Sequence, residues 1–243
     1  MYPNRVLYND LDLNLNGRYG NERRKNMYHY LDDKEFISEM RSLCGGIMQD
    51  LCHILKLDYG IGATFYLVGS GARNLIMQNN NEPVDLDYNL EIIRCEDFED
   101  CRYIKECVRK AFNKALNLND LNDCNDSTVP LTTELIYFTE GNDTEFRMDV
   151  CITVRDEDDN YYRLVHEKTG FVLHDRYFWN IAPNSKRINE KVDYIKKCGK
   201  WMLLRQQYEK IKNMYLIRND YNHSSFVCYM EAVNNVYNLR KSW

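Results

Sequence analysis

Two aspartates stand two residues apart in the segment VDLDYNL, where apolar and polar side chains alternate. Because successive side chains of a β-strand point to opposite faces, this alternation predicts a strand with Val84, Leu86 and Tyr88 on one face and Asp85 and Asp87 on the other. Two like charges this close repel each other, and a plain solvated strand has no need of them. The pair therefore predicts a site for a cation.

A third aspartate lies on a later predicted strand, FRMDVCI. Phe146, Met148 and Val150 form its apolar face, which leaves Asp149 on the opposite face. If the two strands are neighbours, three carboxylates meet on one face of a sheet. Residues two apart on a strand are about 6.6 Å apart at Cα, so the carboxylates can converge on metal ions about 3.5–4 Å apart, as in two-metal phosphoryl and nucleotidyl transfer sites. Hard oxygen ligands favour Mg²⁺ or Mn²⁺ over zinc.

A Gly-Ser-Gly turn precedes these strands, in the segment YLVGSGAR. Gly69 and Gly71 allow a tight turn and a close approach of the backbone to a ligand. Backbone N–H groups at the start of the following helix, with the Ser70 hydroxyl, would face an anion, and Arg73 can add a charge-assisted contact. Gly-Ser turns are common, so this stretch alone does not establish phosphate binding.

The three motifs VGSGAR, VDLDYNL and RMDVCI together resemble the DNA polymerase beta superfamily of nucleotidyltransferases. That superfamily has a strand ending in Gly-Ser, a helix, an Asp-x-Asp strand and a third Asp on a later strand. The resemblance implies that Gly69 and Ser70 hold the triphosphate of a nucleoside triphosphate. It also implies that Asp85 and Asp87 bind two metal ions, and that Asp149 binds the catalytic metal and helps to activate the acceptor hydroxyl. The implied function is metal-dependent transfer of a nucleoside monophosphate, with release of pyrophosphate.

The resemblance covers roughly residues 63 to 154 and departs from the superfamily pattern in two places. Many members have Gly soon after the arginine and Ser-Asp just before the Asp-x-Asp strand, whereas this chain has Asn74 and Pro83-Val84. The subfamily therefore stays open. Each aspartate taken alone can also be a solvent-facing residue of an edge strand. Two other hypotheses remain: a catalytically silent nucleotide-binding or protein-interaction module, for example in a toxin–antitoxin or defence system, and a structural protein without a site.

The elements around these motifs predict an α+β fold, with a nucleotidyltransferase-like mixed sheet flanked by helices and a helical C-terminal part. Apolar residues recur three or four apart from Asp33 to Ile54, which predicts a helix capped by Asp32 or Asp33. Further expected elements are a buried strand TFYLVG, a short helix GARNLIMQ, a helix over 97–116, a hairpin formed by TTELIYFT and EFRMDVCITV, a strand YYRLVHE, and helices near 186–217 and 223–239. The expected domains are an N-terminal arm (1–32), a catalytic domain (33–180) and a helical region (181–243).

The later helices carry a positive charge that can form the other wall of a cleft. From Lys186 to Arg218 there are 10 basic and 3 acidic residues, whereas from Glu82 to Asp159 there are 21 acidic and 8 basic ones. An acidic middle can hold metal and a basic segment can hold a polyanion, although both can also be solvated faces. Five of these basic residues can contact a triphosphate or an acceptor polyanion: Lys186, Arg187, Lys197, Lys200 and Arg205. We expect Lys200 to bind the nucleotide.

Composition limits the remaining choices. The 243 residues include 44% hydrophobic ones, enough for a sizeable core, and the net charge of −5 disfavours a general nucleic-acid coat protein. Nine cysteines match no common zinc or disulfide spacing, which favours reduced thiols in a cytoplasm. No apolar run predicts a signal peptide or a membrane span. The expected partners are a nucleoside triphosphate and an unidentified acceptor (a small molecule, an RNA end or a protein), with no membrane.

Overall fold

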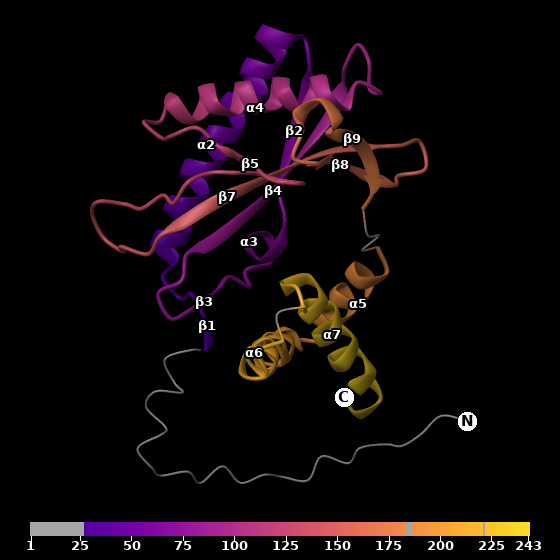
Figure 1. The fold of residues 1–243 in the computed structure, drawn as a ribbon. Helices are drawn as coiled ribbons and strands as arrows, with labels where there is room; N and C mark the ends of the chain where they lie inside the picture. Colours follow the sequence, from indigo (N-terminus) through magenta and orange to yellow (C-terminus); the bar gives the residue numbers. More distant parts are fainter. Residues whose placement is uncertain (1–26, 183–185, 221) are drawn as a thin grey trace.

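The structure is a computed structural model, and it describes residues 27–182, 186–220 and 222–243. Strands and helices interleave up to residue 181, and helices follow to the end of the described chain (Figure 1). In chain order the elements are β1 (Tyr28–Tyr30), α2 (Lys34–Tyr59), β2 (Gly62–Leu67), α3 (Gly69–Arg73), β3 (Met77–Asn79), β4 (Val84–Arg94), α4 (Cys101–Asn117), β5 (Asn125–Asp126), β6 (Leu131–Thr132), β7 (Phe146–Arg155), β8 (Tyr161–Glu167), η1 (Val172–His174), β9 (Arg176–Ile181), α5 (Lys186–Lys197), α6 (Trp201–Ile217), α7 (Ser225–Asn238) and η2 (Leu239–Ser242).

A mixed sheet forms the centre of the fold, as the sequence predicts. Within the described residues its main path is β2-β4-β7-β6-β5, while β8 pairs with β7 and β9 pairs with β8. The two central strands, β4 and β7, run parallel, and all other pairs in this sheet are antiparallel. Their register sets Asp85 opposite Arg147 and Asp87 opposite Asp149. The predicted strands that carry the three aspartates are therefore direct neighbours.

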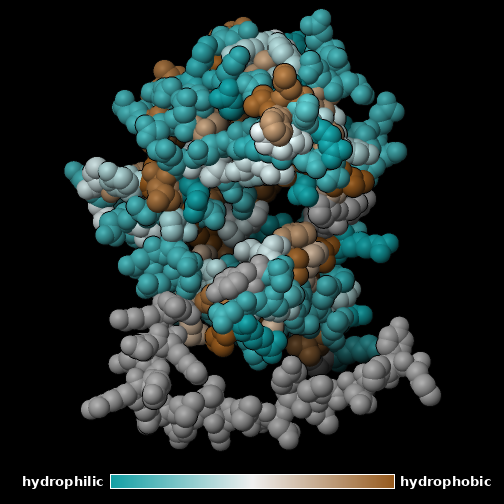
Figure 2. Space-filling view, viewed as in Figure 1, coloured by the Kyte–Doolittle hydropathy of each residue, from teal (hydrophilic) through white to brown (hydrophobic). Residues whose placement is uncertain are grey.

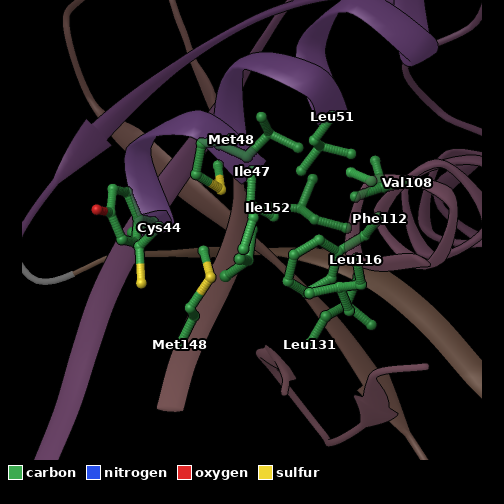
Figure 3. Close-up of a cluster of buried hydrophobic side chains, with 14 of the residues drawn as sticks. Cys44, Ile47, Met48, Leu51, Val108, Phe112, Leu116, Leu131, Met148 and Ile152 are labelled. Carbon is green, nitrogen blue, oxygen red and sulfur yellow. The ribbon is translucent and has the colours of Figure 1, made fainter. Parts of the chain in front are cut away.

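Helices α2 and α4 cover the apolar face of this sheet (Figure 1). Helix α2 begins after Asp33, whose side chain accepts a hydrogen bond from the Phe36 N–H, which confirms the predicted cap. Side chains from α2 and α4 meet those of β6 and β7 in a buried cluster (Figure 3). The residues labelled there are Cys44, Ile47, Met48, Leu51, Val108, Phe112, Leu116, Leu131, Met148 and Ile152. The helices cover this face, and the polar side chains at the alternate strand positions lie on the other face of the sheet.

Several local expectations are wrong in detail. The strand TFYLVG is half-buried because β2 lies at the edge of the main path and pairs only with β4. The predicted helix from Asp97 starts later, after the Asp100 cap, so Phe98 lies before the helix and is exposed. The short helix GARNLIMQ ends at Arg73. The sequence analysis also misses β9 and the break at Gly199, whose φ of +69° separates α5 from α6.

The C-terminal helices build a second apolar cluster with residues that follow α3. Leu75 and Met77 pack there with buried side chains of α5, α6 and α7. Residues 27–32 belong to the expected N-terminal arm; Tyr28 lies in β1, and its backbone exchanges two hydrogen bonds with Asn213 of α6. The rest of that arm, residues 1–26, lies outside the described residues.

The face of the molecule drawn in Figure 2 is mostly hydrophilic with scattered apolar patches. The face seen in Figure 2 is hollowed between the body around the sheet and the C-terminal helices, and α3 lies on the sheet side of this hollow in Figure 1. In the described parts of the chain, each helix is too short or too polar to cross a membrane.

Candidate functional site

The three predicted carboxylates lie on one face of two adjacent strands. Asp87 of β4 is the register partner of Asp149 of β7, and Asp85 is one pleat repeat away on β4. Burial, together with the negative charges of Asp149 and Asp85, raises the pKa of Asp87 to about 6. The carboxylates thus repel one another, as expected for a group that is completed by a cation.

The Gly-Ser turn packs directly on one of these carboxylates. Gly69 has a φ of +63°, and a Cβ atom at this position would lie only 2.2 Å from Asp87 Oδ2. The Val68 N–H also donates a 2.8 Å hydrogen bond to the Asp87 carbonyl. A side chain at position 69 would therefore be excluded by both backbone conformation and space. The expected triphosphate turn and the expected metal ligands are one contiguous site.

The other two predicted residues of the turn have different surroundings. The Ser70 hydroxyl is half-buried and has no hydrogen-bond partner among the described residues, so it is available to a ligand. Arg73 donates a 2.8 Å hydrogen bond to the Gly69 carbonyl, and its guanidinium lies 4.8 Å from the ring centre of Tyr229 in α7. Arg73 therefore joins the turn to the C-terminal helices, while its charge also lowers the pKa of Asp87 against the effects above.

Two of the carboxylates have protein partners that the sequence analysis does not predict. Arg147 Nε lies 2.9 Å from Asp85 Oδ1 in an ion pair, and Thr132 Oγ1 donates a 2.5 Å hydrogen bond to Asp149 Oδ1. The alternation of β7 places Arg147 on the same face as Asp149, so this arginine carries a sequence signal. Thr132 carries none, because β6 is only two residues long.

A divalent cation suits these oxygen donors, although they are not gathered into a finished coordination shell. Within the described ranges, no group of three or more His, Cys, Asp or Glu side chains is arranged to hold a metal ion. Asp85 is turned to Arg147, and one oxygen of Asp149 is taken by Thr132. Burial and the nearby charges of Asp149 and Asp85 raise the pKa of Asp87, and added positive charge would oppose this effect.

A lysine outside the predicted set supplies positive charge from the helical region. Lys212 of α6 lies within electrostatic reach of Asp85, and its ammonium is 3.8 Å from the ring centre of Tyr28. Burial lowers the pKa of Lys212, against the opposing effect of acidic groups that include Asp85. Its only sequence signal is its place in the basic segment from Lys186 to Arg218, which contains ten basic residues.

The predicted lysine, Lys200, stands at the other end of the same helix. It precedes α6, and its ammonium lies 6.0 Å from the ring centre of Trp243. Twelve residues of helix separate it from Lys212, a rise of about 18 Å. No described contact joins Lys200 to the carboxylates or to the turn, so its nucleotide-binding role stays a prediction. Arg205 is stacked on Tyr30 at 4.0 Å, and the side chain of Lys186 lies outside the described residues.

A polar cavity adjoins the carboxylates on the side of Asp149. Its volume is about 560 Å³. Its lining consists of Asn125, Ser127, Thr132, Thr133, Glu134, Leu135 and Arg147. Thr132 and Arg147 are the residues that contact Asp149 and Asp85, so the cavity opens directly beside the acids.

No protein-family model matches the sequence, and no curated protein does. Solved structures do match it in fold. DncV of Vibrio cholerae, a cyclic AMP-GMP synthase solved with the linear intermediate 5′ pppA(3′,5′)pG, is 13% identical with a TM-score of 0.58 over 87% of this chain and 69% of that chain. The DncV structure with nonhydrolyzable GTP gives 13% and 0.57, over 89% of this chain and 70% of that chain.

A protein from a second organism shows the same likeness. CdnC of E. coli MS115-1, solved with ATP, is 13% identical with a TM-score of 0.53, and the match covers 88% of this chain. This chain spans 64% of the length of CdnC. The comparisons therefore show that the chain has a nucleotidyltransferase-like fold, as its Gly-Ser, Asp-x-Asp and later Asp residues predict.

Proposed function

We propose that this protein is a metal-dependent nucleotidyltransferase that transfers a nucleoside monophosphate from a nucleoside triphosphate to an acceptor hydroxyl and releases pyrophosphate. One observation carries the proposal. Asp87 is the register partner of Asp149 and also packs against Gly69, so the acids and the Gly-Ser turn form a single site. The likeness of fold to nucleotide-bound enzymes supports it.

The residues of the turn and of α6 would hold the triphosphate. Gly69 lets the backbone come close to the phosphates, and the Ser70 hydroxyl is available to donate to a phosphate oxygen. Lys212 would add a positive charge from the opposite wall. Arg73 would act mainly by keeping the turn in place against α7, through the Gly69 carbonyl and the Tyr229 ring.

Asp85, Asp87 and Asp149 would hold the divalent ions, Mg²⁺ or Mn²⁺. Such ions, when bound, neutralise charge on the phosphates and make an acceptor hydroxyl easier to deprotonate. In the reaction the acceptor oxygen forms a bond to the α-phosphorus, the bond to pyrophosphate breaks, and the acceptor loses its proton. Thr132 donates to Asp149 Oδ1, so Oδ2 would be the oxygen of Asp149 that holds an ion. Most of the rate enhancement would come from positioning and electrostatics.

The polar cavity beside Asp149 is the natural place for the acceptor. Hydroxyl, amide and guanidinium groups line it, so it suits a polar acceptor with hydrogen-bonding groups. A second nucleotide is the first acceptor to test, because the DncV structure of similar fold holds a linear dinucleotide intermediate. A small molecule, an RNA end and a protein hydroxyl are the other arms of that test.

The experiment incubates the chain with each labelled nucleoside triphosphate and magnesium, alone and with cell extract, and measures pyrophosphate and the labelled product. Asp149→Asn should remove turnover while the fold is kept, and the matched variant Asp158→Asn, in an exposed loop, should not change it. Magnesium-dependent nucleotide binding without pyrophosphate in any arm would instead favour the silent nucleotide-binding module. No nucleotide binding would contradict both.

A further inference from the structure

Four ionisable side chains form a second polar group in the molecule, apart from the three carboxylates. This buried charge cluster consists of Lys105, Asp126, His166 and Asp175. The Lys105 side chain is 0% exposed, and its ammonium lies 2.8 Å from Asp126 Oδ1. Burial alone would favour a neutral lysine, so the ion pair is needed to hold its charge.

His166 of β8 joins the two acids of the cluster. Its Nδ1 lies 2.8 Å from Asp126 Oδ2 and its Nε2 lies 3.1 Å from Asp175 Oδ2. The ring stacks on Tyr177 with 4.2 Å between ring centres. Each ring nitrogen thus has a carboxylate partner, and the position of the ring is fixed from three sides. The cluster connects α4, β5, β8 and the segment before β9.

The cluster and its surroundings bond every carbonyl of the turn between β5 and β6. Two lysines supply side-chain donors: Lys168 Nζ donates to the carbonyl of Asp126, and Lys105 Nζ donates to those of Ser127 (3.0 Å) and Val129 (3.5 Å). Two backbone N–H groups complete the set: that of His166 donates to the carbonyl of Thr128 (2.7 Å), and that of Ser127 donates to the carbonyl of Pro130 (3.1 Å). Five consecutive carbonyls are therefore satisfied. A shift of the turn would take two carbonyl acceptors away from the fully buried Lys105 ammonium, so this lysine favours one position of the turn.

This turn leads directly into the residue that contacts Asp149. After the last bonded carbonyl come Leu131 and Thr132, which form β6 and pair with Val150 and Asp149 of β7. Thr132 Oγ1 then donates its 2.5 Å hydrogen bond to Asp149 Oδ1. The cluster and the carboxylate are thus linked by a short, fully bonded stretch of chain.

We propose that the buried charge cluster positions Asp149 for the transfer reaction, acting through the turn and Thr132. The proposal rests on the proposed function, since it assigns Asp149 to that site. A buried ion pair contributes little net stability compared with apolar packing, whereas it strongly penalises alternative arrangements that separate the charges. The arrangement fixed here is that of the turn. Lys105, Asp126 and His166 are therefore positioning residues, and Thr132 is the group that transmits their effect.

A double-mutant cycle tests this link. Lys105→Met keeps the length of the side chain and removes the donor to the turn, and Thr132→Val keeps shape and removes the hydroxyl. Each should lower kcat by about ten- to a hundredfold, because a small misplacement of a reacting group has effects of this size. The KM for the nucleoside triphosphate and its magnesium-dependent affinity should stay within about twofold, since the Gly-Ser turn is untouched. Thr132→Ser, which keeps the hydroxyl, is the matched control and should retain most of the activity.

Non-additivity identifies the route. If Lys105 acts through Thr132, the double variant should be no slower than the slower single variant. Multiplying effects, or equal loss of nucleotide affinity and kcat, would overturn the proposal and leave a general structural role. Assays should be run well below the melting temperature of each variant. If Lys105→Met does not fold, His166→Gln replaces it in the same cycle.

Hydrogen exchange supplies a readout that does not depend on activity. In Lys105→Met the amide of Ser127 in the turn and the amide of Thr133 directly after β6 should exchange faster, whereas the Leu75 amide, which is bonded to the Ser70 carbonyl, should not change. Unchanged exchange at Ser127 and Thr133 would contradict the proposed positioning even in an inactive protein. Faster exchange in a chain that never releases pyrophosphate would instead show that the proposed function, and not the link, has failed.

Discussion

Two groups of carboxylates lie on or beside the same sheet, and the pKa of an acid is raised in one group and lowered in the other. Asp87 faces other acids, and burial with their repulsion raises its pKa to about 6. Burial also acts to raise the pKa of Asp126, but Lys105 and His166 outweigh that effect and hold the pKa below the usual range. In the first, uncompensated group, Asp87 and Asp149 have no ion-pair partner among the described residues, although Asp85 pairs with Arg147, and this is typical of a site that a ligand completes. In the second, paired group, Asp126 and Asp175 both pair with His166. Both are partly buried, so charge pairing and not burial separates the candidate site from the scaffold.

The sharpest test of this difference is removal of one acid from the uncompensated group. Asp87→Asn should lower turnover on the order of a thousandfold, because the carboxylate belongs to the reacting site. The same variant should unfold at an equal or higher urea concentration at neutral pH, since it relieves repulsion. Asp158→Asn is the control for general loss of negative charge. An Asp87→Asn protein that keeps its turnover would contradict the assignment of Asp87 to the reacting site.

The paired group should respond in the opposite sense. Asp126→Asn leaves the buried Lys105 ammonium without its counter-ion, so the free energy of unfolding should fall by about 3 kcal/mol. Urea denaturation followed by circular dichroism measures this change. Nucleotide affinity of the folded fraction should be retained. A variant as stable as the parent would show that the cluster is not tightly coupled.

The turn that contacts the uncompensated group can be tested with two glycines. Gly69→Ala should lose about 2 kcal/mol of stability and nearly all nucleotide binding, because its methyl group would meet Asp87 Oδ2. Gly60→Ala is a matched control, since Gly60 has a similar φ of +67° with no atom within 4 Å of a Cβ. It should lose about 1 kcal/mol and keep nucleotide binding. Equal effects of the two changes would mean that close packing on Asp87 is unimportant.

The raised pKa of Asp87 predicts how pH acts on stability. The carboxyl has a pKa of about 6 in the folded chain and an ordinary value near 3.8, so the folded chain binds the extra proton between these values. Stability from this group is therefore present at low pH and is lost as pH rises through about 6. Asp87→Asn should remove that loss, a gain of about 1–2 kcal/mol at pH 7.5. Denaturation of both proteins at pH 5 and pH 7.5 measures the difference, and equal pH dependence would contradict it.

The smallest expected effect concerns the cation that reaches the acids from α6. Lys212→Met should weaken nucleoside triphosphate binding about tenfold, the size of one charge-assisted contact. Lys210→Met, on the exposed side of the same helix, is the control and should bind normally. Calorimetric titration with a nonhydrolysable triphosphate compares them. Identical affinities would remove Lys212 from the site and return attention to Lys200.

The alternation of apolar and polar residues is enough to predict which strand face carries the acids, whereas the residues that contact the acids are known only from the tertiary structure. The period of two puts Asp85 and Asp87 on one face of β4 and Asp149 on the same face of β7, and the structure confirms that these strands are neighbours. The Arg147 ion pair and the Thr132 hydrogen bond depend on segments that approach only after folding. Lys212 is likewise one of many lysines until α6 is docked.

The same distinction holds for the fold. The apolar stripe and cap of α2 are local signals, and both are confirmed. The exposure of Phe98 depends on where α4 begins, and the partial exposure of β2 depends on its position at the edge of the sheet. Local periodicity therefore predicts an element, while its burial is decided by the neighbours that fold against it.

The measurement that tests the central claim most directly is anomalous diffraction from crystals grown with Mn²⁺ and a nonhydrolysable nucleoside triphosphate. We expect manganese peaks within coordination distance of oxygens of Asp85, Asp87 and Asp149, with the triphosphate against Gly69 and Ser70. A triphosphate bound elsewhere, or manganese that contacts none of the three carboxylates, would contradict it.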